Sequence, residues 1–234
     1  MKEHELRELV GNYQPNKYVL EALKTVAVAA TVGPSASGKT TVMYRAIASW
    51  PNVHLILDET SRPPRHHEQQ NIDYLFRSRE EIIKDMQDGA LVQVAIGPNG
   101  DLYCTHLRGY PRGGIGAIAL IPAAVEQFRN LPFSSFVAAF IVPENYDRWQ
   151  EWLANQARYS TWTPQQKQKR LEEARESYEF ALSDNQIRFV LNDTIEAASD
   201  RFMQVARGQD PDDEQKARTI AQTNLERLGH EIST

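Results

Sequence analysis

The segment that most constrains the fold is GPSASGKT at residues 33–40, which lies between an apolar stretch and an amphipathic one. The stretch before it, TVAVAATV, is small, β-branched and uncharged, as in a buried parallel strand. The stretch after it, KTTVMYRAIASW, places apolar residues at helical spacing. A strand, a glycine-rich loop and a helix in this order are the context that a phosphate-binding loop requires. The sequence therefore predicts a nucleotide phosphate site here.

Each residue type in this loop suits a phosphate ligand. Gly33 and Gly38 allow the backbone to bend so that consecutive N–H groups point at one anion. Lys39 is expected to reach the β- and γ-phosphates, and the hydroxyl of Thr40 is expected to bind Mg²⁺. The positive N-terminal end of the following helix favours the same phosphates. The residues expected to bind ATP with Mg²⁺ are Gly33, Ser35, Ala36, Ser37, Gly38, Lys39, Thr40 and Thr41.

Strand-like and helix-like segments alternate along most of the chain. The expected strands cover residues 25–32, 53–57, 115–121, 135–142 and 187–192. The expected helices cover residues 39–50, 122–131, 144–159, 163–182 and 194–207, with a last, solvated helix at 210–231. This alternation predicts an α/β fold whose five strands form a mainly parallel sheet covered on both faces.

Residues 58–107 interrupt the alternation and are polar. They contain the loop SRPPRHHEQQ, a charged helix at 78–89 and a hairpin at 90–105 that turns at Asn99 and Gly100. In sheets of this kind ligands bind at the edge where the phosphate loop lies. The insert is therefore expected to contribute to a ligand site at that edge.

The composition excludes several classes of protein. The formal net charge of −5 argues against a general nucleic-acid binder. The single cysteine, Cys104, excludes an internal disulfide framework and a thiolate metal cluster, which suits a reducing cytosol. The first residues are charged, and no uncharged run approaches the roughly 20 residues that span a bilayer. We therefore expect a cytoplasmic protein that binds neither nucleic acid nor membranes, while its oligomeric state is not indicated.

A second anion site is predicted in the insert, in TSRPPR at residues 60–65. Arg62 and Arg65 lie three residues apart, and the two prolines between them stiffen the loop. Two guanidinium groups on a stiff loop can bind a phosphate monoester bidentately, and the hydroxyl of Tyr74 can add a hydrogen bond. Two phosphate sites in one chain predict phosphoryl transfer between two bound substrates.

These motifs resemble those of the guanylate kinase family. GPSASGKTT resembles the family's phosphate loop, TSRPPR resembles its T-T-R-x-P-R, and IDYLF stands at the interval of its D-Y-x-F. LYCT is similar to the Y-Y-G-T/S that closes the nucleotide-binding insert, QKRLEEARES to the lid helix, and FVLND to a strand end. The likeness covers residues 25–207. It implies a phosphate-loop kinase core with a five-stranded mainly parallel sheet, a small mixed α/β substrate-binding insert and a helical lid that closes over ATP.

The resemblance implies how the chain is divided. The core comprises residues 25–57, 108–145 and 171–208. The insert that binds a nucleoside monophosphate comprises residues 58–107, and the lid comprises residues 146–170. Helical extensions are expected at residues 1–24 and 209–234.

The resemblance also assigns roles to individual side chains. The expected catalytic residues are Lys39 and two arginines of the lid, Arg158 and Arg170. Asn192 lies where the family contacts the adenine of ATP. The implied activity transfers the γ-phosphoryl group of ATP to a nucleoside monophosphate, GMP or dGMP. The residues expected to bind this acceptor are Asp58, Arg62, Arg65, Tyr74, Gln93, Tyr103 and Thr105.

The base-recognising end departs from the family pattern. A glutamate that can accept two N–H bonds from guanine is replaced by Gln93, which offers one acceptor and one donor. A family serine is replaced by Asp58, and the acids of the family's D-x-D-x-Q-G are absent, with Ala119 and Ile121 as the nearest matches. The pocket is then either rebuilt for another acceptor, such as another nucleotide or ribose 1,5-bisphosphate, or it belongs to a slow guanylate kinase. A non-catalytic binding module is a further alternative, which the complete phosphate loop disfavours.

Asp58 has two interpretations of its own. The segment VHLILDE is an apolar strand that ends in two acids, so Asp58 can replace the missing acid beside the metal. The alternative is an acid that caps the turn ETSR.

A few further side chains are expected to be structural. His66 and His67 lie in a polar loop and are expected to be solvated, and Cys104 is expected to be a small packing residue. Trp149, Trp152 and Trp162 in the lid region either shield the reaction from water or pack between helices.

Overall fold

The computed structural model describes residues 3–64, 68–72, 74–97, 100–156 and 159–232. The chain forms two compact units. The first comprises Met1–Ala27, His54–Gly116 and Gln127–Ser135, and the second comprises Val28–Val53, Ala117–Glu126 and Phe136–Thr234. Within the described residues, no helix is long and apolar enough to cross a membrane.

The main sheet has five parallel strands in the order β2-β7-β1-β8-β9, which confirms the predicted fold class. Its strands are β1 (Ala27–Val32), β2 (Val53–Leu55), β7 (Ile115–Ala119), β8 (Ser135–Pro143) and β9 (Arg188–Asn192). The central strand β1 leads directly into the predicted phosphate loop. The loop therefore follows the carboxyl end of the middle strand, where ligands of parallel sheets bind.

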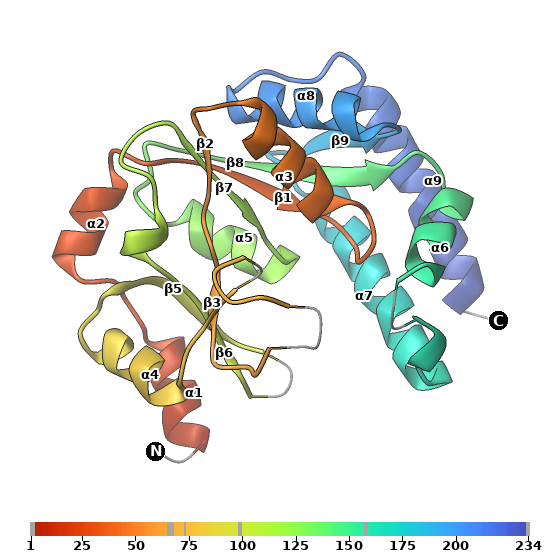
Figure 1. Cartoon of the computed structure of the whole chain (residues 1–234). Helices are drawn as coiled ribbons and strands as arrows, with labels where there is room; N and C mark the ends of the chain where they lie inside the picture. Colours follow the sequence, from red (N-terminus) through yellow and green to blue (C-terminus); the bar gives the residue numbers. More distant parts are fainter. Residues whose placement is uncertain (1–2, 65–67, 73, 98–99, 157–158, 233–234) are drawn as a thin grey trace. The chain divides into compact units, whose positions relative to one another are not determined.

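Helices of the second unit pack in pairs (Figure 1). α3 (Lys39–Ser49) packs beside α8 (Ile195–Ala206), and α7 (Pro164–Ser183) packs beside α9 (Glu214–Ile232). α6 (Tyr146–Ala154) contacts α9, and both α8 and α9 contact β9. These contacts bury one apolar face of each helix, which is how amphipathic helices are stabilised in globular proteins.

The start of α7 follows from local capping chemistry. The Thr163 hydroxyl accepts a hydrogen bond from the Gln166 N–H at 3.2 Å, and the Gln166 side chain accepts one from the Thr163 N–H at 2.8 Å. This capping box, followed by Pro164 in the first turn, ends the preceding loop and begins the helix. The predicted helix at 163–182 is thereby confirmed.

The first unit contains a second sheet of four strands, in the order β4-β3-β6-β5. Its strands are β3 (Glu59–Thr60), β4 (Leu75–Phe76), β5 (Leu91–Ile96) and β6 (Leu102–His106). β5 and β6 pair antiparallel and form the predicted hairpin, in which Gly100 has a φ of 82° and Asn99 lies outside the described residues. β3 pairs antiparallel with β6 and parallel with β4. The first unit also contains α4 (Arg79–Gln87), whereas α5 (Pro122–Arg129), which follows β7, is divided between the two units.

The N-terminal helices form part of the core of the first unit. α1 (Glu3–Gly11) and α2 (Lys17–Leu23) both contact β5. Leu6 on α1 packs in one apolar cluster with Ile82 of α4 and Leu91 of β5. Burial of a side chain of this size stabilises a fold by about 2 kcal/mol. The N-terminal extension therefore stabilises the same unit that contains the insert.

The C-terminal helix corrects one expectation. α9 occupies the segment predicted as a solvated helix, but Ala217, Ala221, Asn224 and Leu228 form a buried stripe along it. The Asn224 amide donates a hydrogen bond to the Tyr178 hydroxyl of α7 at 3.3 Å. Three of the four stripe residues are small or polar, so hydropathy did not reveal the buried face.

Candidate active site

The loop between β1 and α3 has the conformation of an anion-binding loop. Gly33 and Gly38 have φ values of 147° and 91°, which favour glycine. A Cβ on Gly38 would lie 2.2 Å from Nδ2 of Asn192, so no other residue fits there without movement. Ala36 is also left-handed, with a φ of 64°. The glycine positions of the sequence motif are thus explained by backbone geometry.

Lys39 lies against the loop that precedes it. Its Nζ atom donates hydrogen bonds to the carbonyl oxygens of Gly33 and Pro34, at 2.8 and 2.7 Å. Burial lowers the pKa of Lys39 from 10.5 to about 8. A desolvated ammonium group of this kind interacts strongly with a phosphate because little water screens it.

Several polar groups of the loop are available to phosphates. The buried Ser37 Oγ has no hydrogen-bond partner within the described residues. Gly38 has no side chain that caps α3, so the N–H groups of its first turn remain available to an anion. The hydroxyl-bearing residues Thr40 and Thr41 are exposed at the start of α3. These features fit a polyphosphate, with Thr40 free to bind a metal ion.

Two distant side chains hold the loop in place. The indole Nε1 of Trp149 donates to the Ser35 carbonyl at 2.8 Å, and the Asn192 amide donates to the Ser37 carbonyl at 2.9 Å. Both side chains are buried. Of the two predicted roles of Trp149, packing is therefore confirmed. The support of the loop by Trp149 was not predicted, because nothing in the sequence links residues 114 positions apart.

Replacing Ala36 by glycine should stabilise the protein. An L-residue in the left-handed region costs about 1 kcal/mol, which exceeds the entropy that glycine adds to the unfolded chain. We expect the free energy of unfolding of Ala36→Gly to rise by about 0.5–1 kcal/mol in urea titrations. Gly38→Ala is the matched control and should be destabilised, because its Cβ meets Asn192. A destabilised Ala36→Gly variant would contradict the strain at this position.

The predicted acceptor-phosphate residues of the insert form one cluster. The Nε atom of Arg62 donates to the hydroxyl of Tyr103 at 3.2 Å, and its guanidinium carbon lies 5.3 Å from the ring centre of Tyr74. The rings of Tyr74 and Tyr103 contact edge to face, with centroids 6.2 Å apart. Burial, followed by the charge of Asp58, raises the pKa of Tyr74 to about 12, so it is a hydrogen-bond donor at neutral pH. Three predicted residues thus lie together, while Arg65 lies outside the described residues.

The predicted base-binding residues each have one protein partner. The Gln93 amide donates to Oε1 of Gln127 at 3.0 Å, so its carbonyl oxygen remains an acceptor. The buried Thr105 hydroxyl lies 2.9 Å from the hydroxyl of Tyr110. Gln127 and Tyr110 were not predicted, because their contacts depend on how the chain folds back on the insert.

Asp58 differs from the other acids of this unit because its carboxylate makes no hydrogen bond or ion pair within the described residues. The interpretation as a turn cap is therefore wrong. Burial raises the pKa of Asp58 to about 7. A strongly perturbed pKa of this kind is typical of functional sites. Its predicted role beside a metal stays a prediction.

The unusual pKa of Asp58 should make stability depend on pH. Between pH 4 and 7 the folded protein keeps a proton that the unfolded chain has lost, so the free energy of unfolding falls as the pH rises through this range. Asp58→Asn removes this penalty. Because Asp58 is only half-buried, we expect the variant to gain about 2 kcal/mol over the wild type at pH 8 and almost nothing at pH 4. Urea titrations of both proteins at pH 4 and pH 8 check this. A difference in unfolding free energy between variant and wild type that is the same at both pH values would refute it.

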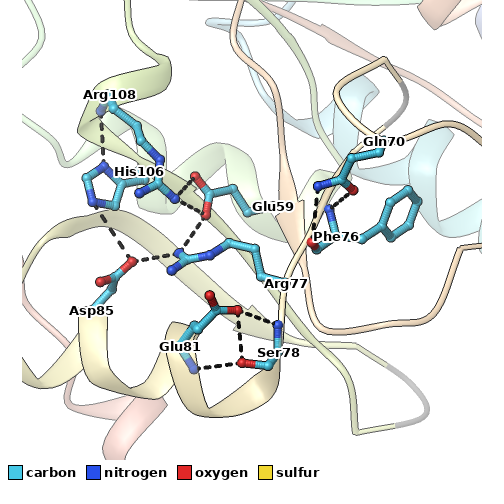
Figure 2. Close-up of polar contacts among 9 residues, drawn as sticks. All are labelled: Glu59, Gln70, Phe76, Arg77, Ser78, Glu81, Asp85, His106 and Arg108. Atoms are coloured by element: carbon cyan, nitrogen blue, oxygen red, sulfur yellow. Dashed lines mark hydrogen bonds and ion pairs between the residues drawn. The ribbon is translucent and has the colours of Figure 1, made fainter.

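A buried ionic network lies beside this cluster (Figure 2). Glu59, which is 3% exposed, accepts hydrogen bonds from Arg77 at 2.8 Å and from Arg108 at 2.7 Å. Arg77 also donates to Asp85 of α4 at 2.6 Å, and His106 Nε2 lies 3.9 Å from the same carboxylate. The network joins β3, α4 and the end of β6. It therefore fixes the strand that precedes Arg62.

The structure describes one of the two predicted lid arginines. Arg170 on α7 donates to Glu173 at 2.6 Å, and its guanidinium carbon lies 5.5 Å from the Trp162 ring centre. It is half-exposed, so it is accessible to a ligand. Arg158 lies outside the described residues, as do His66 and His67.

Besides the phosphate loop, the described part of the chain contains no second candidate site for metal or thiol chemistry. No group of three or more histidine, cysteine or acidic residues there could hold a metal ion. Cys104 is buried in the apolar core of the first unit, and burial raises the pKa of its thiol. This confirms its expected packing role. The predicted metal role of the Thr40 hydroxyl stays a prediction.

Comparisons with known proteins identify relatives of this chain. The chain is 30% identical to a guanylate kinase of Cutibacterium acnes over 181 residues, which are 74% of this chain and 86% of the relative. It is 26% identical to a guanylate kinase of Thermotoga maritima over 204 residues, or 86% of this chain and 93% of the relative. No family model matches the chain.

The fold has a solved counterpart. The structure of a guanylate kinase from Anaplasma phagocytophilum superposes with a TM-score of 0.54 at 19% identity, covering 78% of this chain and 85% of that one. At this identity the likeness establishes the fold alone.

Proposed function

The chain belongs to the guanylate kinase family, and on that premise we propose that it transfers the γ-phosphoryl group of ATP to GMP or dGMP, yielding ADP and GDP or dGDP. The enzyme is a nucleoside monophosphate kinase of the guanylate kinase type. The relatives' names favour GMP over the other acceptors that the altered base pocket left open.

One structural observation carries the proposal. The loop at residues 33–40 combines left-handed turns, an uncapped helix start and a desolvated lysine. A loop with unfilled donors and a cationic side chain matches a polyphosphate ligand. ATP is thus proposed to bind Gly33, Ser35, Ala36, Ser37, Gly38, Lys39, Thr40 and Thr41, with Asn192 beside the adenine.

The reaction needs no covalent intermediate. A phosphate oxygen of GMP attacks the γ-phosphorus, and the bond from that phosphorus to the oxygen shared with the β-phosphate breaks, leaving ADP. Lys39 and the lid residues Arg158 and Arg170 are proposed to stabilise the charge on the transferred group. The hydroxyl of Thr40 would hold Mg²⁺, and the chemistry that the ion would supply is neutralisation of phosphate charge.

The acceptor is proposed to bind in the insert. Its phosphate would be bound by Arg62, Arg65, Tyr74 and Tyr103. Guanine offers N–H donors, and the carbonyl of Gln93 and the unpaired carboxylate of Asp58 are acceptors of matching type. Thr105 is proposed to hold the base as well.

The setting of the reaction is part of the proposal. One buried thiol and no membrane-spanning helix in the described residues suit a cytoplasmic enzyme whose partners are small nucleotides.

The proposal is tested by measuring ADP formation from ATP and Mg²⁺ with GMP, dGMP, AMP, CMP, UMP, dTMP and ribose 1,5-bisphosphate. We expect GMP and dGMP to give the highest kcat/KM. Higher turnover with another acceptor would mean that the base pocket was rebuilt. No turnover with any acceptor would mean that the base pocket was rebuilt or retired if Mg²⁺-ATP still stabilises the protein against heat, and that the protein is a binding module if it does not.

A further inference from the structure

The guanidinium group of Arg62 is almost fully occupied by the protein itself. Nη1 donates to Oε2 of Glu68 at 2.7 Å and to the Pro63 carbonyl at 2.9 Å, and Nη2 donates to Oε1 of Glu68 at 3.0 Å. Nε donates to the hydroxyl of Tyr103. Arginine has five N–H groups, so within the described residues one N–H, on Nη2, is left for a ligand. The sequence prediction of a bidentate grip by Arg62 therefore does not fit this arrangement.

The pair formed by Arg62 and Glu68 is buried. The two side chains are 9% and 7% exposed. Removing one partner from a buried ion pair is strongly unfavourable, since it leaves an uncompensated charge. A ligand phosphate thus gains more from donors that are already free than from displacing Glu68.

Free donors are present around this pair. The Tyr103 hydroxyl accepts a hydrogen bond from Arg62, so its own hydrogen points elsewhere and has no acceptor in the described residues. The Tyr74 hydroxyl also has no partner there. Together with the remaining N–H of Arg62, these give three donors in one cluster. A dianionic phosphate with three terminal oxygens is the ligand that such a cluster suits.

The loop that carries Glu68 is itself fixed to the sheet. The side-chain amide of Gln70 pairs with the backbone of Phe76 in β4, accepting at 2.9 Å and donating at 3.3 Å (Figure 2). The Tyr74 carbonyl accepts a hydrogen bond from the N–H of Asn71 at 3.0 Å. Glu68 is thus anchored two residues before a segment that is bonded to β4.

We propose that Glu68 is a positioning residue for the acceptor: it orients Arg62, and through Arg62 the Tyr103 hydroxyl, so that both bind the acceptor's phosphate. This inference rests on the proposed function, because it concerns the phosphate of GMP. Glu68 does not touch the substrate. Its carboxylate sets the direction of the two donors that do.

The experiment compares wild type with Glu68→Gln and Glu68→Asp, each titrated with GMP and with guanosine, which lacks the phosphate. We expect Glu68→Gln to weaken GMP binding and raise the KM for GMP about tenfold, since charge-assisted hydrogen bonds are redirected. The affinity for guanosine and the KM for ATP should stay unchanged, and Glu68→Asp should restore part of the loss because it keeps the charge. Tyr103→Phe combined with Glu68→Gln should lose less than the sum of the single losses.

Glu3→Gln is the matched control, because it makes the same chemical change at an acid that accepts hydrogen bonds from Arg7 in the same unit and does not touch Arg62. It should leave the ratio of GMP to guanosine affinity unchanged. Tighter GMP binding by Glu68→Gln would show that Glu68 competes with the phosphate, and equal binding would show a purely structural role; either result overturns the inference. If Glu68→Gln does not fold, the same ratio measured on Glu68→Asp decides. A wild type that binds no GMP would instead refute the proposed function.

Discussion

We expect the Lys39→Met variant to lose phosphoryl transfer while keeping its fold. Lys39 is the desolvated cation of the phosphate loop, and its Nζ lies on the carbonyls of Gly33 and Pro34. Methionine keeps the length of the side chain but supplies neither charge nor donors. Removal of one such stabilising group from a water-excluding site lowers turnover by about 10³-fold. Steady-state ADP formation with GMP measures the loss.

The stability of the same variant follows from the pKa of Lys39. Burial lowers that pKa to about 8, so between pH 8 and 10.5 the unfolded chain binds more protons than the folded protein. The free energy of unfolding of the wild type therefore rises as the pH rises through this window, and below pH 8 the penalty is complete. Methionine has no such penalty, although it loses two hydrogen bonds worth about 1 kcal/mol each. We expect the variant to unfold at the same or a higher urea concentration at pH 7.

Lys24→Met is the matched control, because Lys24 is an exposed lysine on the surface that pairs with Glu21. It should change neither turnover nor the urea midpoint. Retention of more than a tenth of the activity by Lys39→Met would remove Lys39 from the catalytic residues. A lower urea midpoint at pH 7 would instead show that the lysine stabilises the empty loop.

Local chemistry made much of the fold predictable. The phosphate loop, the capped start of α7 at Thr163 and the hairpin at 90–105 depend on residues close in sequence, and each was found where expected. Alternation of strands and helices indicated the parallel sheet. The strands could be recognised as apolar runs, because strands of such a sheet are buried on both faces. The two-residue strands β3 and β4 were missed, because two residues show no alternation.

Contacts between distant residues could not be predicted. Asn192 and Trp149 each donate to a carbonyl of the phosphate loop from positions more than a hundred residues away. The occupancy of Arg62 by Glu68 was missed for another reason. The two lie six residues apart, but only the folded loop decides whether an arginine meets a substrate or a neighbouring acid.

The ionic network around Glu59 should contribute more to stability than any surface pair of this chain. We expect Glu59→Gln to lower the free energy of unfolding by about 3 kcal/mol in urea titrations. The carboxylate is 4% exposed and binds two arginines, and glutamine keeps its shape without its charge. Arg77 keeps its bond to Asp85, and Arg108 is half-exposed, so the loss stays near the lower end for a broken buried pair.

Glu3→Gln provides the matched control in the same unit. Glu3 also accepts two hydrogen bonds from one arginine, Arg7, but both side chains are more than half exposed. Water screens that pair, so we expect Glu3→Gln to leave the urea midpoint nearly unchanged. Both variants replace a glutamate by glutamine, so the difference between their losses of unfolding free energy measures the effect of burial.

A double-mutant cycle separates the ion pair from the packing around it. Arg77→Met alone should also destabilise the protein, since it leaves Glu59 with a single partner that is exposed to water. Combined with Glu59→Gln it should cost less than the sum of the two, because the buried charge of Glu59, which Arg77→Met leaves with one partner, is then absent. The idea would be refuted if the losses of unfolding free energy were additive. It would also be refuted if Glu59→Gln lost no more than Glu3→Gln, because the buried network would then stabilise the protein no more than a surface pair. The positioning of Arg62 would then depend on Glu68 and the loop alone, and no longer on the strand that Glu59 anchors.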